Sequence, residues 1–252
     1  MSGKMKKIVI AILLICSLKS YSQEFTVAVA ANAHDVVSEL IASFEKSQPE
    51  KINLVSGASG TLNSQIKNGA PFDLFMAADT TYTQELYTHG LTIGKPSIYA
   101  IGKLVLCSIR LKDLSKWPAY LTNHPGEKIA IANPVAAPYG RATIEYLQSI
   151  SLLNKIKEAV IYGTSISQVN LYIIAGSVSM GFTSMSFIKE CEFRKQQIYW
   201  LAPDPKSYHQ IAQEMVLLKN GTARSKKNAA LFYTYLLSKQ ARLIFKKYGY
   251  SI

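Results

Sequence analysis

The sequence predicts an α/β protein of two lobes, each a mainly parallel β-sheet flanked by helices, with a cleft between the lobes. Short apolar segments alternate with amphipathic segments through about six units, which is the pattern of parallel strands joined by helices. The chain has 252 residues, of which 48% are hydrophobic and 17% charged. That composition is typical of a folded globular protein, and six units are more than one small sheet holds.

The individual elements follow from local patterns. Apolar runs such as FTVAVA predict strands, and apolar residues spaced three and four apart predict helices. Gly69 and Gly90 are placed to end two of these helices. Strands are expected at residues 25–30, 52–56, 73–77, 104–109, 128–132, 160–162, 180–183 and 215–219. Helices are expected at residues 34–47, 61–68, 81–89, 141–150, 167–175 and 226–248.

The order of these elements predicts the lobes. Residues 23–101 together with 214–252 form the first lobe, and residues 102–213 form the second. The chain then crosses between the lobes twice, near Gly102 and near Gln213, and we expect the crossing segments to act as a hinge.

Residues 1–22 are expected to be a cleaved signal peptide. They have a basic start, an apolar run over residues 8–16 and small residues before a cleavage point after Ser22. The run is too short to span a bilayer comfortably, so a retained membrane anchor is the weaker interpretation. Lipid anchoring at Cys16 is disfavoured because the preceding Ile15 is bulky. We therefore expect a periplasmic protein.

Charge and cysteine content exclude several classes of protein. The net charge of +12 would fall to +8 without the four lysines of the leader. No basic stripe interleaved with aromatic residues is present, so we expect no nucleic-acid partner. Three cysteines without a CxxC pattern predict neither a disulfide scaffold nor a zinc site. We expect Cys107 and Cys191 to be free thiols, although both remain after cleavage of the leader and could pair in an oxidising compartment.

Four turns between predicted strands and helices share one chemistry. Residues 31–33, 56–61, 133–140 and 163–167 are small, neutral and rich in residues that cap helices. Helix starts expose unpaired N–H groups and the positive end of the helix dipole. Ligands of open α/β sheets bind at such turns. Two lobes facing each other would therefore form a cage of donors for an anion, although ordinary helix capping explains any one turn by itself.

Particular motifs also resemble a known family. The runs ASGTL and GAPFDLF followed by AAD, together with VAVAANA, NPVAAPYG, GTSISQ and the ending IFKKYGY, resemble the periplasmic molybdate/tungstate-binding proteins of ABC transporters. The resemblance covers nearly all of the mature chain. It implies the type II periplasmic-binding-protein fold, with the oxyanion in the cleft.

The resemblance implies five contacts with the oxyanion: Asn32, Ser59, Tyr139, Ile166 and Ser184. Asn32 would offer its side-chain amide and its N–H, Ser59 its hydroxyl and N–H, and Tyr139 and Ile166 their N–H groups. Ser184 stands where the family has a tyrosine, so this chain departs from the family pattern there. Asn32, Ser59, Tyr139 and Ile166 would hold the metal only as its oxyanion, not as a bare ion.

The resemblance implies molybdate or tungstate as ligand and the membrane permease of an ABC transporter as partner. We expect no cofactor, no enzymatic activity and a monomer. Phosphate is disfavoured because its proton wants a carboxylate acceptor, and none of the four turns carries Asp or Glu. Sulfate or another tetrahedral oxyanion remains an alternative ligand. Sulfate is also a dianion and differs from molybdate in size, so selection would depend on the size of the cage. A serine hydrolase built on Ser59 is a weaker alternative, because the G-x-S-x-G elbow is missing. An iron protein with paired tyrosines is weaker still.

Overall fold

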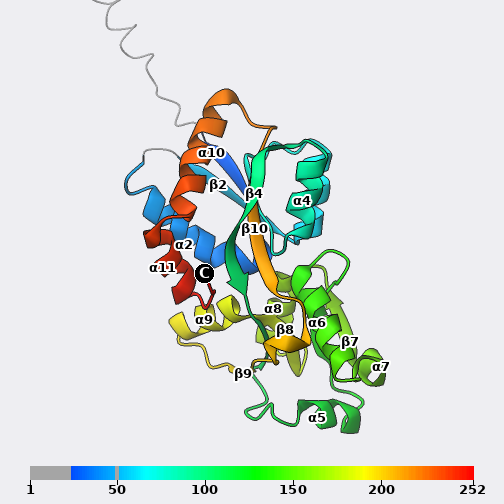
Figure 1. The fold of residues 1–252 in the computed structure, drawn as a ribbon. Coiled ribbons are helices and arrows are strands. Elements are labelled where there is room, and N and C mark those ends of the chain that lie inside the picture. Colours follow the sequence, from blue (N-terminus) through cyan, green and yellow to red (C-terminus); the bar gives the residue numbers. More distant parts are fainter. Residues whose placement is uncertain (1–23, 49–50) are drawn as a thin grey trace, which may run out of the picture.

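The computed structural model describes residues 24–48 and 51–252, which fold into two lobes drawn one above the other in Figure 1. Each lobe is built on a five-stranded sheet with helices packed against it. The predicted two-lobed α/β fold is confirmed. The predicted leader, with Cys16 and the cleavage point, lies outside the described residues.

The first lobe orders its strands β2-β1-β3-β10-β4. Its strands are β1 (Phe25–Ala30), β2 (Ile52–Gly57), β3 (Leu74–Met76), β4 (Thr92–Gly102) and β10 (Ile211–Leu218). Its helices are α2 (His34–Phe44), α3 (Ser59–Lys67), α4 (Thr81–Thr88), α10 (Ala223–Leu236) and α11 (Lys239–Lys247), with a 3-10 turn at Ala31–Ala33. Because β1 runs parallel to both β2 and β3, the turns that follow these strands leave the sheet at one edge.

The alternation of side chains along β1 fixes this sheet between two apolar layers. Val27 and Val29 belong to the core that packs with α2, α10 and α11. Ala28 lies in the opposite core with Phe75, Leu62 and their neighbours on α3 and α4. Successive side chains of a strand point to opposite faces, so β1 is buried on both sides. The turn after it is thereby held rigidly.

The second lobe orders its strands β7-β6-β8-β5-β9. Its strands are β5 (Leu104–Ser108), β6 (Ile129–Ala132), β7 (Val160–Gly163), β8 (Met180–Ser184) and β9 (Tyr199–Leu201). Its helices are α5 (Trp117–Asn123), α6 (Pro138–Ser149), α7 (Leu153–Ile156), α8 (Ile166–Ile174) and α9 (Met185–Phe193), with 3-10 turns at Lys157–Ala159 and Pro205–Ser207. Since β6 is parallel to β7 and β8, the starts of α6 and α8 lie at one edge of this sheet.

Both sheets are more mixed than the predicted, mainly parallel ones. Four strand pairings are parallel and four are antiparallel. The antiparallel pairs all involve β5 or β10, the strands by which the chain enters the second lobe and returns to the first. An apolar run indicates a buried strand but carries no information about its direction. The hinge role of the segments near Gly102 and Gln213 stays a prediction.

Several elements differ from the sequence prediction. β4, α5, α9 and β9 were not predicted, because their residues mix polar and apolar side chains without a clean period. The single helix expected over residues 226–248 is two helices, since Ser238 accepts a hydrogen bond from the N–H of Ala241 and starts α11. Cys107 and Cys191 are buried free thiols. In the described part of the chain, no helix is both long and apolar enough to span a membrane.

Candidate functional site

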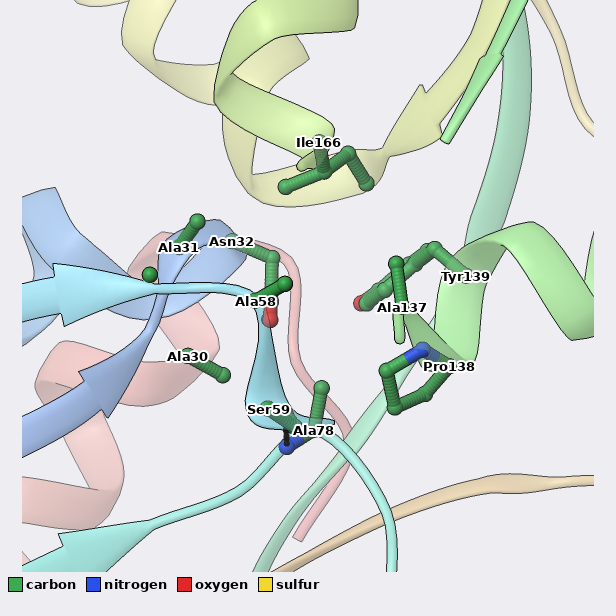
Figure 2. A pocket seen from close by; sticks show the side chains of 11 residues that line it. Ala30, Ala31, Asn32, Ala58, Ser59, Ala78, Ala137, Pro138, Tyr139 and Ile166 are labelled. Atoms are coloured by element: carbon green, nitrogen blue, oxygen red, sulfur yellow. Dashed lines mark hydrogen bonds between the residues drawn. The ribbon is translucent and has the colours of Figure 1, made fainter. Parts of the chain in front are cut away.

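A small pocket lies where the two lobes meet, with an empty volume of about 210 Å³. Figure 2 shows Tyr139 and Ile166 at helix starts of the second lobe, opposite Asn32 and Ala58 of the first. The lining residues are Ala30, Ala31, Asn32, Gly57, Ala58, Ser59, Ala78, Ala137, Pro138, Tyr139 and Ile166. None carries a charge. The pocket has room for about one water-sized group, so it suits a small ion.

The pocket is lined by residues of four chain turns, three of which are helix starts. Ser59 and Ile166 are the first residues of α3 and α8, and Tyr139 is the second residue of α6. Asn32 lies in the 3-10 turn that leads into α2. N–H groups in a first helical turn have no partner inside the helix, and the helix dipole is positive there. The pocket is therefore electropositive without any cationic side chain.

Two of the helix starts lack the side chain that would normally satisfy these N–H groups. The N-cap residues of α3 and α6 are Ala58 and Ala137, which make no side-chain cap. The sequence analysis placed the start of α3 two residues too late and the start of α6 three residues too late. It therefore expected capping residues before these helices where the structure has alanines. Pro138 begins α6, as its fixed φ allows. The N–H groups of Ser59 and Tyr139 therefore receive no side-chain cap.

The Ser59 hydroxyl is held in one orientation. Ser59 is 1% exposed, and its Oγ accepts a hydrogen bond from the N–H of Ala78 across 3.0 Å. One oxygen lone pair is thereby used, while the hydroxyl proton stays available for an acceptor. The hydrogen bond from Ala78 is thus compatible with two donors at Ser59, its N–H and its O–H, and their use on a ligand stays a prediction.

Asn32 differs from its prediction. Its side-chain Nδ2 donates to Gln213 Oε1 at 3.1 Å and to the Tyr250 hydroxyl at 3.0 Å, so both amide protons are already used. The predicted donation from this side chain to a ligand is wrong, because the buried amide completes a network inside the protein instead. The backbone N–H of Asn32 is what this residue can offer.

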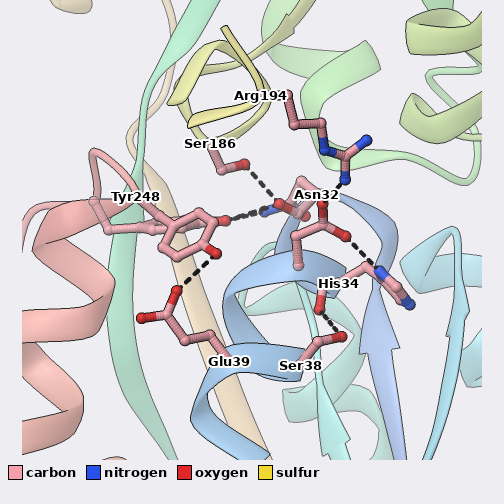
Figure 3. Close-up of polar contacts among 9 residues, drawn as sticks. Asn32, His34, Ser38, Glu39, Ser186, Arg194 and Tyr248 are labelled. Atoms are coloured by element: carbon pink, nitrogen blue, oxygen red, sulfur yellow. Dashed lines mark hydrogen bonds and ion pairs between the residues drawn. The ribbon is translucent and has the colours of Figure 1, made fainter. Parts of the chain in front are cut away.

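Ser184 is not among the lining residues. Its hydroxyl lies 2.8 Å from Ser186 Oγ, which in turn donates to the backbone oxygen of Asn32 at 2.6 Å (Figure 3). Ser186 uses its proton on Asn32, so Ser184 must be the donor to Ser186. The structure therefore brings four of the five predicted residues to one pocket and places Ser184 behind it. That the four bind a ligand stays a prediction.

Charged groups lie beside the pocket, where they join the lobes. Arg141 of α6 pairs with Asp79, which follows β3, and also donates to the Tyr82 hydroxyl at 3.1 Å. Tyr82 donates to the backbone oxygen of Val135 at 2.9 Å. Gly60 N–H donates to Ala136 O, also at 2.9 Å. These contacts all run from the first lobe to the second, so the structure is that of closed lobes.

A second group of charges, the α2–α9 cluster, consists of His34, Asp35, Glu190 and Arg194. Asp35 accepts from Arg194 at 2.7 Å, and His34 Nδ1 lies 2.7 Å from Asp35 (Figure 3). The His34 hydrogen bond lowers the pKa of Asp35 and raises that of His34. Burial and the nearby Asp35 charge raise the pKa of Glu190 to about 8. The cluster thus holds a proton between the lobes at neutral pH.

Comparisons with known proteins agree with this architecture. The family described as bacterial extracellular solute-binding protein matches residues 25–251. A molybdate-binding protein, ModA, of Azotobacter vinelandii is 32% identical over 256 residues and is covered completely, as is this chain. ModA of Rhodobacter capsulatus is 32% identical, covering 96% of this chain and 93% of its own. The solved periplasmic molybdate-binding protein of Azotobacter vinelandii superposes with a TM-score of 0.82 at 30% identity, over 90% of this chain and 99% of that one.

Proposed function

Since the chain belongs to the bacterial extracellular solute-binding proteins, we propose that it captures molybdate or tungstate outside the cytoplasm and delivers the oxyanion to the permease of an ABC transporter. The observation that carries this proposal is the uncharged pocket between the lobes, which is lined by residues of three helix starts and one 3-10 turn. The two molybdate-binding relatives at 32% identity support the choice of ligand.

The donor set matches a fully deprotonated dianion. Asn32, Ser59, Tyr139 and Ile166 supply backbone N–H groups, and Ser59 adds its hydroxyl. A hydrogen bond to a charged group contributes about 1.5–3 kcal/mol, so five of them offset a large loss of ligand hydration. The ligand carries no proton, and it therefore needs no acceptor from the protein. Molybdate and tungstate meet this condition near neutral pH.

Phosphate fits this pocket less well. At neutral pH it keeps a proton that would have to be donated to an acceptor, and no carboxylate lines the pocket. Sulfate is the closer alternative, because it is also a dianion without a proton. Discrimination against sulfate would rest on the size of the closed cage, which a smaller ion fills with longer hydrogen bonds.

Capture proceeds by closure of the lobes, and the contacts Gly60–Ala136 and Tyr82–Val135 then hold the closed form. The protein works as a periplasmic monomer, without a cofactor and without nucleic acid. It catalyses no reaction. The Ser59 hydroxyl accepts a hydrogen bond from the N–H of Ala78. His34, two residues after Asn32 in the sequence, is hydrogen-bonded to Asp35. This arrangement provides no general base for a serine nucleophile.

Titration calorimetry with molybdate, tungstate, sulfate and phosphate tests the proposal. We expect Ser59→Ala to weaken molybdate binding about 10–100-fold, the value of one or two hydrogen bonds to a charged group. The control is His34→Ala, which lies directly after the turn that contains Asn32. It should change the affinity for molybdate by less than about twofold. Equal affinity for sulfate and molybdate would defeat the choice of ligand. A larger loss for His34→Ala would mean the site lies elsewhere, and turnover of a chromogenic ester would favour the hydrolase.

A further inference from the structure

A buried polar network lies directly beneath the pocket, and Gln213 of β10 is at its centre. Gln213 is 0% exposed. Its Oε1 accepts from Asn32 Nδ2 at 3.1 Å and from the Tyr99 hydroxyl at 2.7 Å, and its Nε2 donates to the Tyr139 hydroxyl at 3.2 Å. One side chain of the returning strand thus touches a residue of each pocket wall: Asn32 from the first lobe and Tyr139 from the second.

The network leaves little freedom to these two residues. The other proton of Asn32 Nδ2 goes to the Tyr250 hydroxyl, which itself donates to Asn32 O at 3.0 Å. Tyr250 is in turn held by the chain end, because Ser251 and Ile101 exchange two backbone hydrogen bonds. Burial raises the pKa of the Tyr139 hydroxyl, so it stays neutral. Buried polar groups of this kind are costly to leave unpaired, and the network therefore specifies one arrangement.

A separate steric observation points to the same hydroxyl. Gly102, at the end of β4, has no Cβ, and a Cβ there would collide with the Tyr139 hydroxyl and lie 2.7 Å from Gln213 Nε2. The backbone of Gly102 does not need a positive φ. Glycine is therefore required here for space, and the space is occupied by the Tyr139 hydroxyl. The Tyr139 hydroxyl thus lies in the seam between the lobes, and Tyr139 itself belongs to the first turn of α6, which lines the pocket.

We propose that Gln213, Gly102 and the Tyr139 hydroxyl form a positioning device that sets the Tyr139 N–H against the Asn32 N–H across the oxyanion. Gln213 is a positioning residue and does not itself touch the ligand. The proposal rests on the proposed function, because it assigns the support of that same site. The side-chain hydrogen bond from Gln213 to the Tyr139 hydroxyl thereby controls how closely the N–H groups of Asn32 and Tyr139 converge.

The test compares Tyr139→Phe with Tyr248→Phe. Both remove one buried tyrosine hydroxyl, and Tyr248 donates to Glu39 within the first lobe, away from the pocket. Each change should lower the Tm of the ligand-free chain by about 2–4 °C, as the loss of one buried hydrogen bond would. Only Tyr139→Phe should raise the molybdate Kd, by about fivefold. Equal Kd values for the two variants would overturn the proposal. A wild-type chain that binds no molybdate would instead overturn the proposed function.

Gly102→Ala provides a second test that does not depend on the phenol. Its Cβ should displace the Tyr139 hydroxyl and raise the molybdate Kd by about tenfold. In the double variant Gly102→Ala/Tyr139→Phe the closest collision, with the hydroxyl, is removed and only the contact with Gln213 Nε2 remains, so the increase in Kd should be smaller than the product of the two single increases. Independent, multiplying effects would show that the space at Gly102 does not serve the hydroxyl, and they would overturn this part of the device.

Discussion

The pocket and the lobe contacts beside it are made of different groups. Eleven uncharged residues line the pocket. Beside it, the lobes are joined by the Asp79–Arg141 pair and by the α2–α9 cluster, in which Arg194 reaches Asp35. Both regions are interfaces between the same two lobes. Side chains with full charges are thus used to join protein to protein, whereas the pocket proposed for the anion offers only dipoles.

This difference has a physical reason. A fixed cation in the pocket would attract every anion of suitable size, including those with a proton. Convergent N–H groups act over a short range and depend on distance and angle, so they favour a ligand that fills the cage. The charged pairs at the lobe contacts do not need that selectivity. Each pair carries one charge of each sign, so it joins the lobes without changing the net charge near the pocket.

The largest effect should come from placing a charge in the neutral pocket. Ser59→Asp puts a carboxylate where a dianion must bind, with no lining cation to compensate. Repulsion between like charges in a desolvated site costs several kcal/mol, so the molybdate Kd should rise by at least about 1,000-fold. Calorimetry measures this directly.

Ser59→Asn is the matched control, because it has nearly the same shape as the aspartate and no charge. It should raise the Kd only about 10–100-fold, through the lost hydroxyl and crowding. If the two variants bind molybdate equally, the neutrality of the pocket is not what governs binding, and the contrast between the two regions loses its meaning.

A smaller effect is expected from the Asp79–Arg141 pair. The side chains of Arg141 and Asp79 are 32% and 17% exposed, so the pair is only partly screened by solvent. If the pair closes the lobes, Arg141→Met and Asp79→Asn should each raise the molybdate Kd by about two- to tenfold, because either change weakens the closed form. Calorimetry on both variants, and on the double variant, measures the coupling.

The sign for Asp79→Asn decides the role of this pair. Were Arg141 simply a source of positive field for the ligand, removing its partner would tighten binding. Arg110→Met is the control, because Arg110 pairs with Glu127 inside the second lobe at 3.1 Å and should leave the Kd unchanged. Tighter binding by Asp79→Asn would contradict the assignment of this charge pair to lobe closure.

The sequence was sufficient for the two-lobed fold and for the location of the pocket. Apolar strands such as residues 25–30 and their amphipathic partners gave local signals strong enough to place most units, although β4, α5, α9 and β9 were missed. Strand direction had no such signal, so the antiparallel entry of β5 and β10 was missed. The helix starts were placed late because Ala58 and Ala137 do not look like capping residues, and neither makes a side-chain cap.

Side-chain partners were the limit of the sequence reasoning at the site. The amide of Asn32 looked like a ligand donor, but Gln213 and Tyr250 occupy both of its protons. These partners are 181 and 218 residues away along the chain. No local pattern marks Gln213, which sits in an otherwise ordinary strand. Ser184 was aligned with a ligand position, yet its hydroxyl supports Asn32 only through Ser186.

The smallest effect concerns pH and the α2–α9 cluster. The pKa of Glu190 is raised to about 8 in the folded chain, by burial and by Asp35, with Arg194 opposing and the hydroxyls of Tyr248 and Tyr250 nearby. The folded state therefore binds a proton that the unfolded state has lost, and this contribution to stability disappears as pH rises through 8. Glu190→Gln keeps the neutral form at every pH. Its Tm should equal that of the wild type near pH 5 and exceed it by about 2–4 °C at pH 9.

Other titrations in the cluster do not obscure this comparison. The raised pKa of His34 also makes a contribution to stability that is lost as pH rises above the ordinary value for histidine. Both the wild type and Glu190→Gln contain His34, so this contribution cancels in the comparison. The lowered pKa of Asp35 makes a contribution to stability of the opposite pH dependence, which is lost only as the pH falls into the acid range. Glu192→Gln, on the same helix but exposed and paired with Lys189 at 2.7 Å, should follow the wild type. If Glu190→Gln also follows the wild type from pH 5 to 9, no proton is held between the lobes, and the charges there are an ordinary solvated surface rather than the counterpart of the neutral pocket.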